Sequence, residues 1–429
     1  MNVLVIGRGG REHAICYAFS KSPRVQTVFA APGNAGIAAH AELVSIDESD
    51  QEKLISFAKD NEIEWVFVGP EVPLMAGIVD RFQEAGIKAF GPVEKAAIIE
   101  GSKDFAKQLM ASYGIPTAAS KTFTDYEEAQ TFVKAQGAPI VLKADGLAAG
   151  KGVIVAMTDS EAEEGLKALM LDGHVGTAGT QVVVEEFLEG EEFSLMSFVN
   201  GDYILPMPIS QDHKRAFDGD KGPNTGGMGA YTPVPQIADA EVEKAIETIV
   251  KPAAKAMQKE GRSFTGILYA GLILTKEGPK VIEFNARFGD PETQVILPLL
   301  ETDLVDVLEH VTAQKPLTLS WKNEAVVGVV VASEGYPGTY DKGASLPGLD
   351  KVSENALVFH AGTKAEDGEI VTDGGRVLLA AQTGNTLQEA KDKAYSALRH
   401  LKSNDVFYRT DIGDKAITAA GVSSHTRTQ

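Results

Sequence analysis

The segment Val281 to Glu292 combines an apolar strand pattern with side chains that bind metal ions. Successive side chains of a strand alternate between its two faces, so Glu283 and Asn285 should project together from one face. Ile282 and Phe284 should enter a core on the other face. Carboxylate and amide oxygens are the ligands that a hard divalent cation such as Mg²⁺ or Mn²⁺ prefers. The pair therefore predicts a metal site; the alternative is a half-exposed strand that ends in a polar turn.

Two charged side chains follow this pair within the same segment. The planar guanidinium of Arg287 matches a phosphate or a carboxylate with two parallel hydrogen bonds. A metal ion, a phosphate and a fixed cation would then converge on one short stretch of chain. Arg287 and Asp290 are therefore candidates for the reacting end of such a site.

A glycine-rich turn, Gly7 to His13, follows the first apolar run and opens a helix. It does not fit the dinucleotide-binding pattern, because Glu12 stands where the third glycine is needed and the next strand ends without an acidic residue. Backbone N–H groups at a helix start still suit an anion, so Gly9 and Gly10 are candidates to receive a substrate phosphate. The alternative is a tight turn that uses glycine for steric reasons alone.

A second glycine-rich segment runs from Gly146 to Gly152, between two predicted strands. It is not a P-loop, since the glycine spacing is one residue short, Gly152 replaces the metal-binding hydroxyl, and a strand follows. Such a hairpin can instead fold over nucleotide phosphates, with contacts from Gly146, Gly150 and Gly152. Lys143 at the end of the preceding strand would then bind a phosphate; the alternative is an ordinary hairpin with a solvated lysine.

The octapeptide Arg287 to Gln294 resembles the signature of the phosphoribosylamine glycine ligase family, ATP-grasp enzymes of purine synthesis. The resemblance extends over nearly the whole chain. It implies an α/β multi-domain fold, with an N-terminal parallel βαβ domain, a two-lobed α+β ATP-grasp region and a small C-terminal α+β domain. It also implies catalytic roles for Arg287, Lys143 and Asp290, with Mg²⁺ or Mn²⁺ on Glu283 and Asn285.

The same resemblance assigns a nucleotide site around the acidic run Glu185 to Phe193. Without the resemblance, such a charge run would most often be a solvated loop. The implied ATP contacts fall into three groups: Lys103 and Lys143 at the phosphates; Glu185, Phe187 and Leu188 at adenine; and Glu192 at the ribose.

Substrate contacts are expected from two further segments. The polar stretch from residue 212 to 229 is similar to the substrate loop of the family; read alone, it could be a disordered surface loop. Glu71 lies at the C-terminal end of a predicted parallel strand, where open α/β sheets bind ligands. The candidates are Gly9, Gly10, Glu71, Asp212, Lys214, Thr225, Gly226, Gly227 and Arg287.

The implied reaction is ATP-dependent ligation of glycine to 5-phosphoribosylamine through glycyl phosphate, which yields glycinamide ribonucleotide, ADP and phosphate. One alternative is another ATP-grasp carboxylate–amine ligase or carboxylase, which would share the nucleotide site and the metal strand. A more remote alternative is a non-catalytic nucleotide-binding or NAD-binding module. Fold alone would not separate these functions.

Composition narrows the class of protein further. Asp and Glu number 60 against 40 Lys and Arg, and the net charge of −20 opposes non-specific binding to nucleic acid or anionic membranes. Cys16 is the only cysteine, so neither an intrachain disulfide nor a cysteine-rich zinc site can form. Met1 to Gly7 reads as a strand rather than a signal peptide, and no apolar stretch reaches the roughly 18 residues that a membrane span needs. We expect a cytoplasmic monomer that binds neither nucleic acid nor a membrane.

Alternating apolar and helical patterns predict the elements that position these residues. Ser102 should cap a helix from Lys103 to Tyr113, Gln211 to Met228 should form a loop, and Ala240 to Glu260 should form a helix. The expected units are an N-terminal domain (1–102), a connecting helix (103–120), a small lobe (121–190), a large lobe (191–320), a C-terminal domain (321–420) and a frayed tail (421–429).

Overall fold

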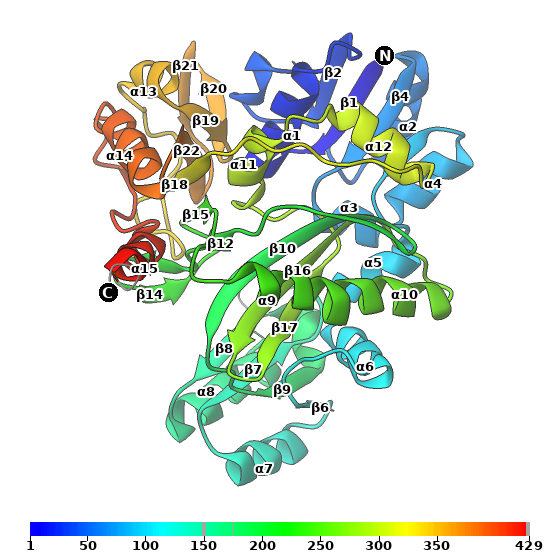
Figure 1. The fold of residues 1–429 in the computed structure, drawn as a ribbon, viewed down its shortest axis with the longest axis vertical. Helices are drawn as coiled ribbons and strands as arrows, with labels where there is room; N and C mark the ends of the chain where they lie inside the picture. Colours follow the sequence, from blue (N-terminus) through cyan, green and yellow to red (C-terminus); the bar gives the residue numbers. More distant parts are fainter. Residues whose placement is uncertain (148–151, 174, 426–429) are drawn as a thin grey trace.

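In the computed structural model of the protein, which describes residues 1–147, 152–173 and 175–425, the N-terminal region forms a parallel five-stranded sheet (Figure 1). The strand order is β3-β2-β1-β4-β5 with all neighbours parallel, so the parallel sheet predicted from the βαβ pattern is confirmed. The elements of this region are β1 (Asn2–Gly7), α1 (Gly10–Ser20), β2 (Thr27–Pro32), β3 (Glu42–Leu43), α2 (Gln51–Asp60), β4 (Ile63–Val68), α3 (Glu71–Met75), α4 (Ile78–Glu84), β5 (Lys88–Phe90) and α5 (Glu94–Gly101).

The helix α6 (Lys103–Tyr113) leads from this domain into the next, and its predicted bounds are confirmed. The Ser102 side chain accepts a hydrogen bond from the backbone N–H of Phe105, which satisfies one donor of the first turn. At the other end Gly114 adopts a left-handed conformation with φ of 65°, which glycine reaches without steric cost. Local capping chemistry therefore sets both ends of this helix.

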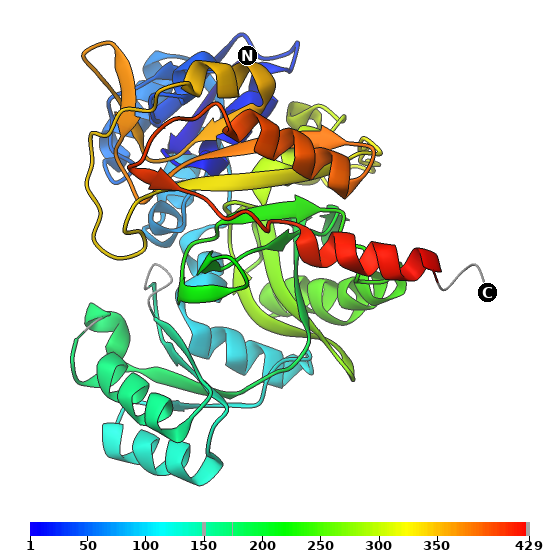
Figure 2. The same cartoon turned by 90° about the vertical axis from the view of Figure 1, so that its left-hand side faces the viewer.

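The small lobe is an antiparallel sheet of order β6-β9-β7-β8 that packs against two helices. Its elements are β6 (Ser120–Phe123), α7 (Tyr126–Gln136), β7 (Ile140–Ala144), β8 (Val153–Ala156), α8 (Asp159–Met170) and β9 (Val182–Glu186). Phe123, Leu142 and Leu166 belong to a hydrophobic cluster made only of residues from this lobe. The lobe therefore has its own core, and Figure 2 shows it projecting from the rest of the molecule.

The large lobe is built on an antiparallel sheet of order β11-β10-β16-β17. Its elements are β10 (Glu191–Asn200), β11 (Tyr203–Pro206), α9 (Asp239–Ala245), α10 (Lys251–Lys259), β16 (Thr265–Thr275), β17 (Gly278–Asn285), α11 (Thr293–Ile296) and α12 (Leu304–Thr312). A π-helical turn at Ile246–Val250 joins α9 to α10, so the predicted helix over 240–260 is confirmed in outline. This sheet carries the predicted metal strand as β17.

The C-terminal sheet was only partly anticipated. Its order is β12-β15-β18-β22-β19, with β23 paired to β18, so it includes two strands from the segment between β11 and α9. The elements are β12 (Gln211–Asp212), β13 (Arg215–Phe217), β14 (Lys221–Asn224), β15 (Gly229–Thr232), β18 (Ala325–Ser333), α13 (Leu349–Asn355), β19 (Leu357–His360), β20 (Thr363–Glu366), β21 (Glu369–Thr372), β22 (Arg376–Gly384), α14 (Leu387–Leu398), β23 (Val406–Phe407) and α15 (Asp414–His425).

Two sequence predictions in this region were wrong. The segment Gln211 to Met228 is not a plain loop, because β12 joins the C-terminal sheet and β13 pairs with β14 in a hairpin. The tail predicted from Gly421 is helical as far as His425, where it continues α15; residues 426–429 lie outside the described part of the chain. In the described residues, no helix is long and apolar enough to cross a membrane.

Candidate active site

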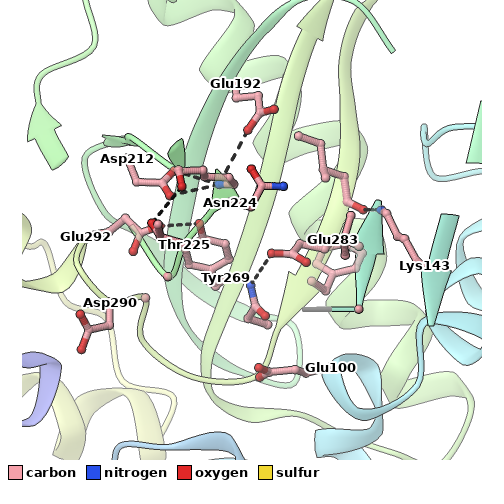
Figure 3. Close-up of a pocket in the computed structure, with 18 of the residues that line it drawn as sticks. Glu100, Lys143, Glu192, Asp212, Asn224, Thr225, Tyr269, Glu283, Asp290 and Glu292 are labelled. Carbon is pink, nitrogen blue, oxygen red and sulfur yellow. Dashed lines mark hydrogen bonds and ion pairs between the residues drawn. The ribbon is translucent and has the colours of Figure 1, made fainter. Parts of the chain in front are cut away.

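A single cavity of about 950 Å³ lies where the N-terminal domain, both lobes and the C-terminal sheet meet. Most predicted site residues line it, including the metal pair on β17; Figure 3 shows Glu283 of this pair in the same pocket as Asp212 and Thr225 of the substrate segment. The predicted residues in the lining are Gly9, Glu71, Lys103, Lys143, Gly146, Gly152, Glu185, Phe187, Leu188, Glu192, Asp212, Lys214, Thr225, Gly226, Glu283, Asn285, Arg287 and Asp290. Gly10 and Gly227 are buried and are not part of this lining, and Gly150 falls outside the described residues.

The metal pair lies on the cavity face of β17. The Asn285 amide nitrogen is 3.4 Å from a Glu283 carboxylate oxygen, so the two side chains converge. The predicted alternation fails at Ile282, because a bulge opposite the Gly271–Leu272 step makes it an extra residue in the strand. Val281 is fully buried instead, and Ile282 lines the cavity.

No group of three or more His, Cys, Asp or Glu side chains in the described residues could hold a metal ion by itself. Glu283 and Asn285 nonetheless present oxygen ligands to the cavity, and oxygen ligands are what a hard divalent ion requires. Phosphate oxygens of a bound nucleotide would have to complete the coordination. Glu283 and Asn285 thus fit a divalent metal ion that binds together with a nucleotide.

Arg287 is held by two carboxylates. Its guanidinium lies 2.8 Å from Glu100 and 3.3 Å from Glu71, which come from the N-terminal domain. Burial disfavours the charged guanidinium, but the attraction of Glu100 and Glu71 outweighs it, so the pKa of Arg287 is raised. Burial raises the pKa of Glu100. Arg287 is thus fixed in position and permanently charged, just after the C-terminal end of the metal strand β17.

The two predicted phosphate lysines each donate to a backbone oxygen. The Lys103 ammonium donates to the backbone oxygen of Gly146 at 2.8 Å, and burial lowers its pKa. The Lys143 ammonium donates to the backbone oxygen of Ile282 at 2.9 Å and lies 3.0 Å from Glu185. Lys143 therefore links the small lobe to the metal strand.

The segment between β9 and β10 forms the hinge from one lobe to the other. Phe187 and Leu188 line the cavity here, and Glu192 follows on β10. A Cβ atom added at Gly190 would lie 2.1 Å from the backbone oxygen of Leu274, which explains the glycine by close backbone approach. The hinge is therefore packed directly against β16.

Charged groups of the substrate segment contact one another in the cavity, where Figure 3 shows Asp212 together with Glu292 and Glu192. The Lys214 ammonium is 3.0 Å from Asp212 and 3.7 Å from Glu192. Burial opposes the charge on Lys214, but Asp212 and Glu192 raise its pKa well above the usual value. Glu292, beside them, accepts a hydrogen bond from the Tyr269 hydroxyl at 2.7 Å, and burial raises its pKa.

The start of helix α1 is already occupied by carboxylates. Asp290 accepts a hydrogen bond from the Arg11 backbone N–H at 3.0 Å, and Glu12 accepts one from Gly9 at 2.6 Å. Burial opposes the charge on Asp290, but Arg376 and Arg11 lower its pKa. The Gly9 donor predicted to receive a phosphate therefore binds a protein carboxylate in this structure, as does the Arg11 donor of the same turn.

Three family models together match most of the chain. The N domain of phosphoribosylglycinamide synthetase matches residues 1–100, its ATP-grasp (A) domain matches residues 101–293, and its C domain matches residues 326–415. The chain belongs to the phosphoribosylglycinamide synthetase family. It is thus an ATP-dependent ligase with the ATP-grasp fold, and the predicted fold class is confirmed.

Two relatives within this family are similar over their whole length. The phosphoribosylamine–glycine ligase of Halalkalibacterium halodurans is 57% identical over 426 residues, which cover 99% of this chain and 100% of the relative. The ligase of the same name from Listeria monocytogenes serotype 4b is 58% identical over 421 residues, covering 97% and 100%. Such identity indicates the same fold and the same set of domains.

Solved structures agree with the family assignment. The crystal structure of phosphoribosylamine–glycine ligase from Thermotoga maritima superposes with a TM-score of 0.86 at 36% identity, over 96% of this chain and 100% of that one. A biotin carboxylase from Campylobacter jejuni reaches a TM-score of 0.72 at 15% identity, over 95% and 92%. The second likeness shows a shared fold only.

Sequence reasoning missed several cavity residues of this family member. Glu292 lies within the octapeptide Arg287 to Gln294, and its closeness to Arg287 in the sequence could have drawn attention to it. Glu100 and Arg376 carried no local signal, because their partners lie in other domains, and Tyr269 carried none because its partner Glu292 lies on a later segment of the same lobe. Arg376 shows this best: its guanidinium donates to the backbone oxygens of Gly226 and Asp290 at 2.9 Å each.

A buried arginine ties the substrate hairpin β13–β14 to the segment before α15. The Arg409 side chain is 1% exposed and lies 3.0 Å from Asp220 and 2.8 Å from Asp411. It also donates to the backbone oxygen of Arg215 at 3.0 Å. The hairpin is therefore held by the end of the chain rather than by its own contacts alone.

Replacing Arg409 by methionine should loosen this hairpin in the synthetase. We expect a stability loss of roughly 3 kcal/mol, because Asp220 and Asp411 would lose the cation between them. Hydrogen exchange followed by mass spectrometry should report faster exchange over residues 215–224. Arg399→Met, at an exposed position, is the control; unchanged exchange in Arg409→Met would show that Arg409 does not hold the hairpin.

Proposed function

We propose that the protein ligates glycine to 5-phosphoribosylamine with ATP, giving glycinamide ribonucleotide, ADP and phosphate. The single observation that carries the proposal is the cavity, which joins the metal pair, the phosphate lysines and the substrate segment in one space. The names of the relatives support the choice of substrates, since they are called phosphoribosylamine–glycine ligases at 57–58% identity.

The nucleotide would lie between the two lobes. Glu185, Phe187 and Leu188 would contact adenine and Glu192 the ribose, while Lys103 and Lys143 would bind the phosphates. Glu283 and Asn285 would hold Mg²⁺ or Mn²⁺, which neutralises phosphate charge when it is bound. The side chains of this set all border the cavity.

Arg287 would hold the transferring phosphoryl group or the acyl phosphate beside the metal strand. Its two carboxylate partners fix the guanidinium before any substrate arrives, so no reorganisation is needed during the reaction. Glu71, 3.3 Å from Arg287, would contact the ribose of the amine substrate from the N-terminal domain. Gly9 and Gly10 would contribute mainly by letting α1 approach the site closely.

The amine substrate would lie against the charged cluster of Asp212 and Lys214, with Thr225 and Gly226 from the same hairpin segment. Asp290 remains ionised at neutral pH because its pKa is lowered, so it would bind an amine rather than take up a proton. Gly227 does not line the cavity, and it would support the turn that carries Thr225 and Gly226. The glycine carboxylate would lie between Arg287 and the nucleotide.

The proposed reaction has two chemical steps. A carboxylate oxygen of glycine attacks the γ-phosphorus of ATP, the bond to ADP breaks and glycyl phosphate forms. The amine nitrogen of 5-phosphoribosylamine then attacks the carbonyl carbon, and the carbon–oxygen bond to phosphate breaks. The nitrogen loses one proton, which the departing phosphate can accept. The protein contributes positioning, fixed charge and exclusion of water.

ADP release from the purified protein, with each component omitted in turn, tests this proposal. ATP, Mg²⁺, glycine and freshly generated 5-phosphoribosylamine should all be required, and mass spectrometry should detect glycinamide ribonucleotide. ADP formation that does not depend on glycine would overturn the substrate assignment and favour a different ATP-grasp ligase. Replacing Mg²⁺ by Mn²⁺ in the same assay identifies the preferred ion.

A further inference from the structure

Lys107 is a buried lysine in the middle of helix α6 that the proposed mechanism does not use. Its side chain is 7% exposed, and its ammonium group has three partners. It lies 3.1 Å from a Glu185 carboxylate oxygen, and it donates to the Thr117 hydroxyl at 2.8 Å and to the backbone oxygen of Ala118 at 3.2 Å. All three ammonium protons are therefore used, which fixes the position of the charge.

The partner of Lys107, Glu185, is bound on both sides. One carboxylate oxygen faces Lys107, and the other lies 3.0 Å from Lys143. The Glu185 side chain is 4% exposed, so both ion pairs are protected from solvent. An ionised carboxylate accepts hydrogen bonds but donates none.

Lys107 and Lys143 also connect the Glu185 carboxylate to the metal strand β17. The Thr117 hydroxyl that accepts from Lys107 donates to the backbone oxygen of Val281 at 2.8 Å. Lys143 donates to the next backbone oxygen along the same strand, that of Ile282, at 2.9 Å. The orientation of Glu185 is thus set from two directions, relative to the strand that carries Glu283.

We propose that Lys107 is a positioning residue that holds Glu185 as the acceptor for the exocyclic amino group of a 6-aminopurine, and so makes the site discriminate against 6-oxopurines. The inference rests on the proposed function only in placing adenine at the hinge. A 6-oxopurine presents an oxygen acceptor at that position and would meet the Glu185 carboxylate with a second acceptor. Without Lys107, Glu185 would lose one of its two cations and part of its fixed orientation.

The charge of Lys107 also gives the selectivity a pH dependence. Burial is the main cause that lowers the pKa of Lys107 to about 8, with a smaller contribution from Lys143; Glu185 and Glu186 oppose it. A lysine with a lowered pKa is charged below that value and neutral above it. The ion pair with Glu185 should therefore be intact near pH 7 and weaken as the pH rises through 8.

Calorimetric titration of the intact protein with ATP and with inosine triphosphate tests the proposal without either ligase substrate. Inosine triphosphate differs from ATP only at the base, where it carries a 6-oxo group and an N1 proton. In Lys107→Met the Kd for ATP should rise by about tenfold while the Kd for inosine triphosphate changes little, since one polar recognition contact is worth about 1.4 kcal/mol. Gln108→Met, at the exposed neighbouring position, should change neither Kd.

Equal weakening of both nucleotides in Lys107→Met, or no change in either, would overturn the proposal. So would a wild-type protein that binds the two nucleotides equally well. If the methionine variant does not fold, Lys107→Gln keeps the test decisive, because the Kd of ATP should rise between pH 7 and pH 9 in the wild type and stay level in this variant. A protein that binds ATP selectively but makes no glycinamide ribonucleotide would refute the proposed reaction and leave this inference intact.

Discussion

Glu283→Ala should abolish turnover while leaving the fold intact. The Glu283 carboxylate faces the cavity, and within the described part of the chain its one polar contact is with Asn285, so its loss removes little packing. Several kcal/mol of charge neutralisation on the nucleotide phosphates would be lost, which corresponds to a fall in kcat of roughly 10³-fold. ADP release under saturating substrates measures the effect, and the melting temperature reports on the fold.

Glu277→Ala is the matched control for this prediction. Glu277 lies in the turn between β16 and β17, on the same hairpin, and its side chain is 77% exposed. Its replacement should leave kcat and the melting temperature unchanged. If Glu283→Ala retained near-normal turnover at saturating Mg²⁺, Glu283 would not be a metal ligand.

Arg287→Met should lose both activity and stability. The substitution removes the fixed cation of the reacting end, for which we expect a fall in kcat of roughly 10²–10³-fold. It also leaves Glu100 and Glu71 buried without the cation between them, at a cost of roughly 3–5 kcal/mol in the free energy of unfolding. Denaturant unfolding and ADP release measure the two effects separately.

A second substitution separates these effects. Arg287→Met combined with Glu100→Gln should recover much of the stability, because the uncompensated carboxylate is gone, but it should recover no activity. The stability loss of Arg287→Met should also shrink as the pH falls. Glu100 has a raised pKa, so the folded variant binds more protons than the unfolded chain, and acid favours the folded state. A loss that stayed constant with pH, and a double variant no more stable than the single one, would contradict this account.

Features set by neighbouring residues were predictable from the sequence. The helix α6 begins and ends where its capping residues Ser102 and Gly114 indicate. Glu283 and Asn285 share a face because they are two residues apart on one strand, and the structure brings them within 3.4 Å of each other. The placement of Arg287 close behind them follows from the same short stretch of chain.

Features set by distant segments were not predictable. Ile282 lines the cavity because β17 is bulged against β16, and the sequence of β17 carries no sign of that register shift. The carboxylates that hold Arg287 come from the N-terminal domain, far away in sequence. Arg376 likewise reaches the site from the C-terminal sheet. Pairings of this kind depend on how the domains pack, which local patterns do not encode.

The pairing of β15 with β18 can form only late in the synthesis of the chain. A ribosome completes β15, at Gly229–Thr232, about ninety residues before β18 begins at Ala325, and β22 comes later still. During this interval β15 can pair with β12 but lacks β18, its other hydrogen-bonding neighbour, and exposed strand edges are prone to pairing with other chains. The hairpin that Arg409 secures must wait longer, until nearly the whole polypeptide has emerged. Premature termination shortly before Arg409 should therefore yield a chain whose nucleotide lobes fold but whose substrate hairpin remains unsecured.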